Sequence, residues 1–258
     1  MSPAGGATPA PRAPDPLLVA AAAMVFVGDP AAPVVDDDDL HHLLDVLRLR
    51  PGELVIAADG SGGWVPCRIA GSATGGSRRA DPTASLVPDG PAVMEPLPVP
   101  EVTVAFAPTK GDRPEWVVQK LTELGVDRIV PLRTSRSVVR WEGDRAVKSV
   151  ERLRRVVREA AGQCRRARLP EVTGVCRLEE VAAVAGGRVT LADAGGGPPE
   201  LGRSVLAVGP EGGWDPAERD SFGPTVGLGA TVLRAETAAL AAGTLLCSLR
   251  SGVVLPLA

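Results

Sequence analysis

Residues that build metal sites and hydrolytic triads are scarce in this sequence. Its 258 residues include two histidines, the adjacent His41 and His42. A multi-histidine metal site is therefore excluded, a Ser-His-Asp triad is disfavoured, and we expect no bound metal. The cysteines are widely separated, at Cys67, Cys164, Cys176 and Cys247. Because they form no Cys-x-x-Cys pair, they signal neither a zinc cage nor a disulfide framework, and we interpret them as reduced thiols of a cytoplasmic protein.

A long hydrophobic run is also missing. The longest uncharged apolar run, Leu17–Val27, is shorter than the about 20 residues that a membrane span requires. It follows Arg12 at the distance expected in a signal peptide, but Asp15 interrupts the approach and no small-x-small cleavage site follows. We therefore interpret the run as a buried first strand.

The sequence has no excess of positive charge, since its formal net charge is -3. A uniformly basic domain, the usual electrostatic footprint of nucleic-acid binding, is therefore absent. The charges are unevenly distributed, however. Acidic residues gather at Asp36–Asp39, whereas residues 145–168 are rich in arginine and hold few acids. One face of the protein can thus be basic although the whole chain is slightly acidic.

The amino-terminal part divides into a leader, a small β-rich domain and a linker. Residues 1–16 are rich in proline, alanine and glycine and are predicted to form a disordered leader, with Met24 as an alternative start. Residues 17–93 contain short apolar runs separated by turn residues, which are typical of a small barrel or sandwich. A helix is predicted there at Leu40–Leu49, and the proline-rich segment Gly90–Pro100 is the predicted linker. The expected strands are Val25–Val27, Glu53–Ala57, Trp64–Ile69 and Ala84–Val87.

After Pro100 the pattern changes to alternating strands and helices. The alternation predicts a mainly parallel sheet that helices cover on both faces. The predicted strands are Val102–Ala107, Arg128–Leu132, Arg188–Ala192, Ser204–Val208 and Thr225–Leu228. The predicted helices are Glu115–Leu124, the amphipathic Val150–Cys164, one that opens at Asp215 with a capping box, and Glu236–Leu249.

Two glycine-containing loops follow neighbouring strands near the carboxyl end of the chain. In Val208–Pro216 a strand ends in a glycine-rich turn and a helix begins, yet the spacing fits neither G-x-G-x-x-G nor a Walker loop. A ligand loop and a tight strand-to-helix connection remain equally open for this motif alone. Leu228–Ala238 repeats the arrangement. Glu236 and Thr237 there are explained by helix capping, whereas Arg234, expected to be buried among its apolar neighbours, needs a partner.

Five stretches together resemble the 16S ribosomal RNA uracil-N3 methyltransferases, which form the ribosomal RNA small subunit methyltransferase E family of the SPOUT superfamily. Five motifs in family order are far more specific than any one of them. The matching stretches are His42–Gly52, Glu115–Val126, Ala160–Val172, Val208–Gly213 and Leu228–Ala239. Departures occur at the start, where Met24–Val27 lacks the usual arginine, and at Asp45 and Pro114.

The resemblance implies an α/β fold: a SPOUT-type parallel sheet with a C-terminal trefoil knot, over residues 100–258, preceded by a small PUA-like β-barrel that binds RNA, over residues 17–93. It also implies a homodimer and S-adenosylmethionine as cofactor. Carried over by position, the cofactor pocket comprises Leu191, Ala192, Val208, Gly209, Pro210, Glu211, Gly212, Gly213, Leu228, Gly229, Leu233, Thr237 and Ala238.

The implied reaction is methyl transfer to uracil N3 of 16S rRNA, as free RNA or in the assembled small subunit. Because N3 carries a proton at neutral pH, the site must remove it or stabilise the anion. Arg234 is the candidate for anion stabilisation or phosphate positioning, and Glu236 for a proton acceptor or an orienter of Arg234. Candidate RNA contacts are Arg48, Arg50, Lys110, Arg113, Arg165, Arg166 and Arg168, of which each is singly also explained as a solvated charge.

Two rival functions remain open from the sequence. The first is a SPOUT methyltransferase that acts on another rRNA or tRNA position. The second is a non-catalytic RNA-binding factor of ribosome assembly that has kept the fold. Binding of S-adenosylmethionine separates the second rival, and nucleoside analysis of the RNA separates the first.

Overall fold

The computed structural model describes residues 14–71 and 85–255, which form two units. The smaller unit comprises Pro14–Leu97 together with Arg158–Leu169, and the larger comprises Pro98–Val157 and the chain from Pro170. The smaller unit is therefore discontinuous in sequence, which the predicted limits of 17–93 and 100–258 did not include. Most of the predicted leader lies outside the described residues. Its last residue, Pro16, begins helix α1 (Pro16–Ala20).

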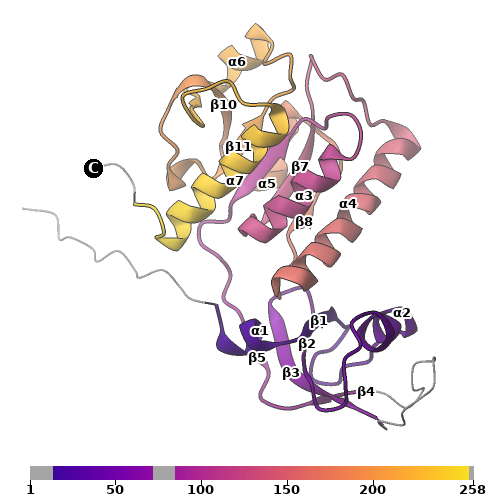
Figure 1. Cartoon of the computed structure of the whole chain (residues 1–258). Helices are drawn as coiled ribbons and strands as arrows, with labels where there is room; N and C mark the ends of the chain where they lie inside the picture. The colour runs from indigo at the N-terminus through magenta and orange to yellow at the C-terminus, as the bar shows by residue number, and fades with distance from the viewer. Residues whose placement is uncertain (1–13, 72–84, 256–258) are drawn as a thin grey trace, which may run out of the picture. The chain divides into compact units, whose positions relative to one another are not determined.

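The smaller unit contains a mixed five-stranded sheet with the order β1-β2-β3-β4, and β5 also pairs with β3 (Figure 1). The pair β1–β2 is parallel, and the other pairs are antiparallel. The four predicted strands are confirmed, whereas the predicted linker contains the short fifth strand. The strands are β1 (Ala23–Phe26), β2 (Leu54–Ala58), β3 (Gly63–Ala70), β4 (Ser85–Pro88) and β5 (Val93–Met94).

Two local predictions in this unit are wrong in their limits. The run Leu17–Val27 is not one strand, because Asp15 caps the short helix α1 and β1 begins only at Ala23. The predicted helix at Leu40–Leu49 starts earlier, as α2 (Asp37–His41), and continues as the π-helical turn η1 (His42–Val46). The carboxylate of Asp36 accepts a hydrogen bond of 2.7 Å from the backbone N–H of Asp39, which fixes this earlier start.

The core of the smaller unit includes residues from the distant segment Arg158–Leu169. Ala161 and Ala167 are fully buried and pack in one cluster with Phe26, Ile56 and Trp64. Ala161 belongs to helix α4 (Gly143–Cys164), which begins seven residues before the predicted Val150. The smaller unit is therefore completed by the segment Arg158–Leu169, which some sixty residues, Pro98–Val157, separate from the rest of the unit in sequence.

The larger unit is built on a parallel sheet, as predicted. The strand order is β10-β11-β6-β7-β8, with β9 beside β7, and every pair is parallel. The short strands β8 and β9 were not predicted. The strands are β6 (Thr103–Phe106), β7 (Arg128–Arg133), β8 (Glu171–Val172), β9 (Cys176–Arg177), β10 (Val189–Gly197) and β11 (Val205–Val208).

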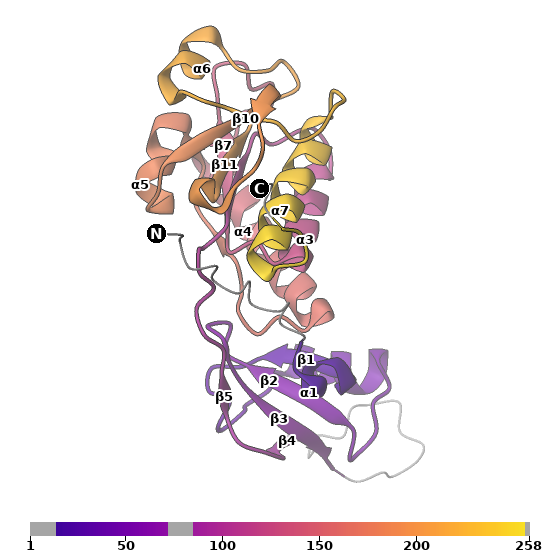
Figure 2. The same cartoon turned by 90° about the vertical axis from the view of Figure 1, so that its left-hand side faces the viewer.

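Helices cover both faces of this sheet (Figure 2). Helices α3 (Arg113–Leu124) and α7 (Ala235–Ser251) lie on one face, and α5 (Val181–Ala185) lies on the other. The α3–α7 contact depends on Gly243, since a Cβ there would lie 2.8 Å from a methyl carbon of Leu121. Short helical segments complete the unit: η2 (Leu178–Glu180), η3 (Leu201–Arg203) and α6 (Pro216–Phe222). No helix in the described part of the chain combines the length and apolarity needed to cross a bilayer.

The predicted strand Thr225–Leu228 is wrong. Val226 instead forms isolated bridges to Ala192 and Gly197 of β10. The backbones approach so closely that a Cβ on Gly196 would lie 2.5 Å from the carbonyl carbon of Val226. Pro224, which precedes this segment, has no N–H group to donate to a β-ladder. The segment therefore crosses close to β10 without forming a further strand of the sheet.

Candidate functional site

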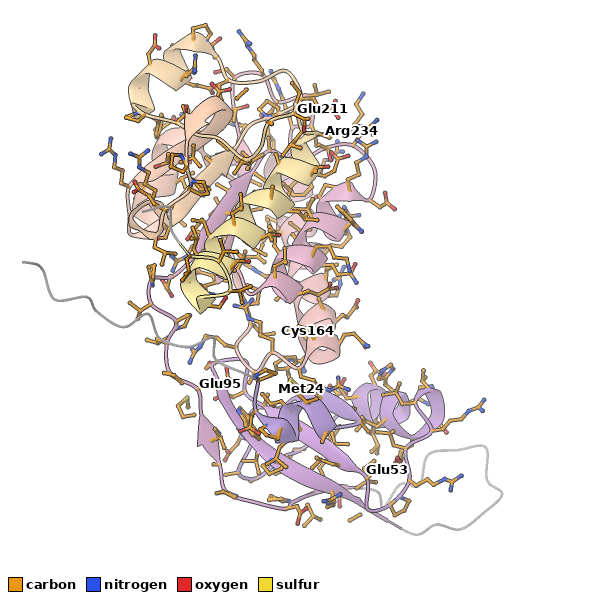
Figure 3. All side chains as sticks on the ribbon, turned by 60° about the vertical axis from the view of Figure 1, so that its left-hand side comes forward. Met24, Glu53, Glu95, Cys164, Glu211 and Arg234 are labelled. Atoms are coloured by element: carbon orange, nitrogen blue, oxygen red, sulfur yellow. The ribbon has the colours of Figure 1, made fainter. Side chains whose placement is uncertain are left out.

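A cavity of about 650 Å³ lies in the larger unit beside the middle of β10 and the carboxyl end of β11. Three chain segments enclose it: the middle of β10, the loop that follows β11, and the loop before α7. We call it the loop cavity. Its lining residues are Arg113, Ala192, Asp193, Ala194, Val208, Gly209, Pro210, Glu211, Gly213, Trp214, Leu228, Gly229, Thr231, Val232, Leu233, Arg234, Ala235 and Ala238. Figure 3 labels Glu211 and Arg234, which lie together beside the amino-terminal end of α7.

Most of the predicted pocket residues meet in this cavity. Those that line it are Ala192, Val208, Gly209, Pro210, Glu211, Gly213, Leu228, Gly229, Leu233 and Ala238, together with Arg234. Leu191 does not, because alternate residues of a strand face opposite sides and its side chain packs in the core. Thr237 is exposed, Glu236 is largely buried, and Gly212 uses its carbonyl to accept a hydrogen bond of 3.1 Å from Arg136.

Trp214, which sequence reasoning missed, holds the loop after β11 against β10. Its indole Nε1–H donates to the carbonyl oxygen of Ala192 at 2.9 Å. A Cβ on Gly209 would lie 3.1 Å from the indole ring, so a glycine is needed for this close approach. The helix α6 begins directly afterwards with the predicted capping box, in which Asp215 and Glu218 satisfy each other's backbone N–H groups. The loop after β11 is therefore held at its start by the packing of Trp214 on Gly209, and at its end by the capping box of α6.

Arg234 lines the cavity but is exposed, and the expectation of a buried arginine is wrong. It is the N-cap residue of α7, a position at the edge of the helix where a side chain can extend into solvent. No carboxylate in the described ranges, 14–71 and 85–255, forms an ion pair with its guanidinium. The positive charge of Arg234 is therefore available to a ligand of the cavity.

Arg113 joins the loop after β11 to helix α7. Its guanidinium Nη1 lies 3.3 Å from Glu236 Oε1 and 3.6 Å from Glu211 Oε1. The side chain of Glu236 is only 13% exposed, and its second oxygen is buried without a hydrogen-bond partner in the structure as described. The structure thus pairs Glu236 with Arg113 and not with Arg234. Arg113, Glu211 and Glu236 lie too far apart in the sequence for any spacing pattern to predict that they would meet.

The other predicted RNA contacts differ in their surroundings. Arg165 donates to the carbonyl oxygens of Ala22, at 2.7 Å, and of Ala21, and burial lowers the pKa of its guanidinium. Arg168 donates to the Glu95 carbonyl at 3.0 Å. These two side chains thus connect segments of the smaller unit. The remaining candidates are exposed or half-buried: Arg48, Arg50, Lys110 and Arg166. Their RNA-binding roles stay predictions.

The cysteines lie outside the loop cavity. None of the four, all within the described residues, forms a disulfide. Burial raises the pKa of the Cys67 thiol to about 11, and burial also raises the pKa of Cys176. These two thiols are therefore poor nucleophiles near neutral pH.

Two family models match the chain. Residues 95–247 match an RNA methyltransferase domain, and residues 35–75 match an RNA methyltransferase PUA domain. The first match covers most of the larger unit, including all three segments that enclose the loop cavity. The fold and these two matches define the class of the protein as an RNA methyltransferase with a PUA domain.

Curated relatives narrow this class. The chain is 38% identical to ribosomal RNA small subunit methyltransferase E of Mycobacterium tuberculosis, over 82% of this chain and 84% of the relative. It is 31% identical to the protein of the same name from Bacillus subtilis, over 80% of this chain and 86% of the relative. The chain belongs to the ribosomal RNA small subunit methyltransferase E family.

Solved structures agree with this assignment. A ribosomal RNA small subunit methyltransferase E from Neisseria gonorrhoeae, bound to S-adenosyl methionine, superposes with a TM-score of 0.71 at 27% identity, covering 88% of this chain and 97% of the other. A putative methyltransferase from Legionella pneumophila, in complex with its cofactor SAM, gives a TM-score of 0.69 at 25% identity, covering 86% and 96%.

Proposed function

We propose that this protein transfers the methyl group of S-adenosylmethionine to N3 of a uridine in 16S ribosomal RNA. The observation that carries the proposal is the loop cavity, in which ten of the residues predicted to bind the cofactor gather beside Arg234. Its relatives are named methyltransferases of small-subunit ribosomal RNA, and one solved relative is bound to S-adenosyl methionine.

The loop cavity suits this cofactor in size and chemistry. Its volume of about 650 Å³ lies within the range of small-molecule sites, roughly 300–1,000 Å³. Apolar side chains such as Leu228, Leu233 and Trp214 can enclose an adenine ring, and the glycines of the loop after β11 expose backbone groups that can bind its edge. Bound there, S-adenosylmethionine supplies an electrophilic methyl group on a positively charged sulfur.

The protein must deal with the proton on uracil N3. Removing it leaves a negative charge on the base, which a fixed cation can stabilise as that charge develops. Arg234 is suited to this role because its guanidinium lines the cavity with no ion-pair partner among the described residues. Glu236 does not line the cavity, and we assign it the role of holding Arg113 in place.

Finer features of the fold belong to the same proposal. We propose that the chain is threaded as a trefoil knot, which is supported by the close passage of Val226 and Gly227 past Gly196. We propose that the mixed sheet of the smaller unit closes as a PUA-like barrel. A cytoplasmic homodimer is also proposed, in line with exposed large apolar side chains of the larger unit such as Val232, at 96%, and Trp116, at 44%.

Two measurements test the activity. Calorimetry should show that the purified protein binds S-adenosylmethionine, which a non-catalytic assembly factor would not do. Mass spectrometry of nucleosides from 16S rRNA should show a 3-methyluridine that disappears when the gene is deleted. A methyl group that disappears from a ribose oxygen or from tRNA instead would contradict the proposed substrate.

Replacing Arg234 by alanine should lower kcat for methyl transfer by about a hundredfold or more, because removal of one donor that stabilises a developing anion has an effect of that order. The thermal unfolding temperature should not change, since the side chain is exposed. Arg188→Ala is the matched control, because Arg188 is exposed in the same unit but directly precedes β10 and is not among the residues that line the cavity. Equal kcat in both variants would remove Arg234 from the mechanism.

A further inference from the structure

A second hollow of the larger unit lies between the loop that follows β6 and the amino-terminal half of α4. Its volume is about 490 Å³, and the buried Trp141 forms part of its wall. Asp144 is the one acidic residue among its described lining residues, against four cationic ones. These are Lys110, Arg145, Lys148 and Arg152. We call it the basic hollow.

The cations of the basic hollow are largely without partners. Arg145, Lys148 and Arg152 follow one another at intervals of three and four residues, which places them on one face of α4. Arg152 forms an ion pair of 2.5 Å with Glu115. Lys110, Arg145 and Lys148 are exposed and take part in no ion pair within residues 14–71 and 85–255. Unpaired charges of one sign around one hollow attract a polyanion.

A smaller hollow of about 340 Å³ lies between the basic hollow and the loop cavity, with lining residues in common with each. We call it the bridging hollow. With the basic hollow it shares the lining residues Thr109, Lys110 and Val139. With the loop cavity it shares Arg113, Pro210 and Glu211. The three hollows therefore adjoin one another, and we call the row that they form from the loop cavity to the cations of α4 the path.

The walls of this path change character along its length. Pro108, Val138 and Pro210 give the bridging hollow apolar surfaces, which suit the faces of a nucleobase. The basic hollow offers ammonium and guanidinium groups, which suit phosphate oxygens. An RNA strand matches this arrangement, because each apolar base face is joined through its sugar to a negatively charged phosphate.

We propose that the basic hollow binds the phosphates of the RNA strand next to the target uridine, whose base lies in the bridging hollow with its edge toward the loop cavity. The inference rests on the proposed function and extends it to a substrate path. Lys110 is thereby kept as an RNA contact, and Arg145 and Lys148 are added to the predicted ones. These residues bind the backbone and position the strand without reading its sequence.

Binding to small ribosomal subunits from a strain that lacks the gene tests this path. Filter binding at several salt concentrations is compared for Arg145→Gln, Lys148→Gln and the charge-matched control Arg188→Gln. The first two should raise Kd about fivefold and reduce the salt slope of log Kd by about 0.7 each, as the loss of one phosphate contact does. Lys148→Arg should bind like the wild type. All variants should keep the calorimetric affinity for S-adenosylmethionine, because none of these residues lines the loop cavity.

The results separate the path from the activity. If Arg145→Gln and Lys148→Gln match Arg188→Gln in both Kd and salt slope while the wild type methylates the subunits, the basic hollow is not the RNA path and the proposed function stands. If the wild type neither binds nor methylates 16S rRNA, whether free or in the subunit, the proposed function is wrong and the path is wrong with it.

Discussion

The ion pairs of Arg113 hold together two chain segments that enclose the loop cavity. Glu211 belongs to the loop after β11 and is 62% exposed, whereas Glu236 belongs to α7 and is 13% exposed. The exposed contact with Glu211 contributes little, because solvent screens it. The contact with Glu236 matters more, since a largely buried carboxylate without a counter-charge is destabilising.

Replacing Arg113 by methionine should therefore weaken S-adenosylmethionine binding by about tenfold, or about 1.4 kcal/mol. The double variant with Glu236→Gln should recover part of this loss, since the glutamine leaves no buried charge unpaired. Calorimetry of the wild type, both single variants and the double variant gives the coupling energy. Strictly additive losses would show that the two side chains act independently.

For the helices and strands, the sequence predicted the kind of each element better than the residues at which it begins and ends. Strand and helix positions in the larger unit were predictable where apolar periodicity was strong, as in β6 and α3, and Gly125, with φ +93°, ends α3 as expected. The strand predicted at Thr225–Leu228 failed because a short apolar run does not reveal which partners its backbone meets. The charged first turns of α4 were missed because they carry no apolar stripe.

The sequence likewise predicted which loops form the site but not the contacts that hold these loops together. The resemblance located the loops that enclose the cavity, and the structure brings most of those residues together. It did not reveal Trp214, whose indole hydrogen bond joins the loop to β10, or the pairing of Arg113 with Glu236. Both are contacts between segments far apart in sequence, and the residues involved have no local pattern that marks them.

The crossing of β10 and the Val226 segment gives a prediction about Gly196. Gly196→Ala should lower the free energy of unfolding by about 2 kcal/mol or more, because the added methyl group meets backbone atoms that cannot move aside separately. Chemical denaturation measures this change. Gly202→Ala is the control, since a Cβ at Gly202 meets nothing within 4 Å. Equal stabilities of the two variants would mean that the close approach does not exist.

For the whole molecule, the discontinuous smaller unit leads to a prediction about fragments. Residues 14–97 alone lack Ala161 and Ala167 and leave the cluster around Phe26, Ile56 and Trp64 partly uncovered. They also lack Arg165, whose guanidinium connects to the carbonyls of Ala21 and Ala22. We expect this fragment to unfold without a cooperative transition, because a domain of this size has little stability in reserve.

The same fragment extended through a flexible glycine-serine linker by residues 158–169 should regain a cooperative thermal transition. Circular dichroism melting curves of the two fragments make the comparison. A sharp transition of the shorter fragment at the temperature of the longer one would show that the added segment does not complete the core.

This discontinuity also bears on the order of events during protein synthesis. The ribosome releases residues 14–97 first, but the segment that closes their core emerges only after β6, α3 and β7 have been made. The amino-terminal unit must therefore wait, incompletely packed, while much of its successor is translated. A nascent chain paused before residue 169 would hold both units unfinished.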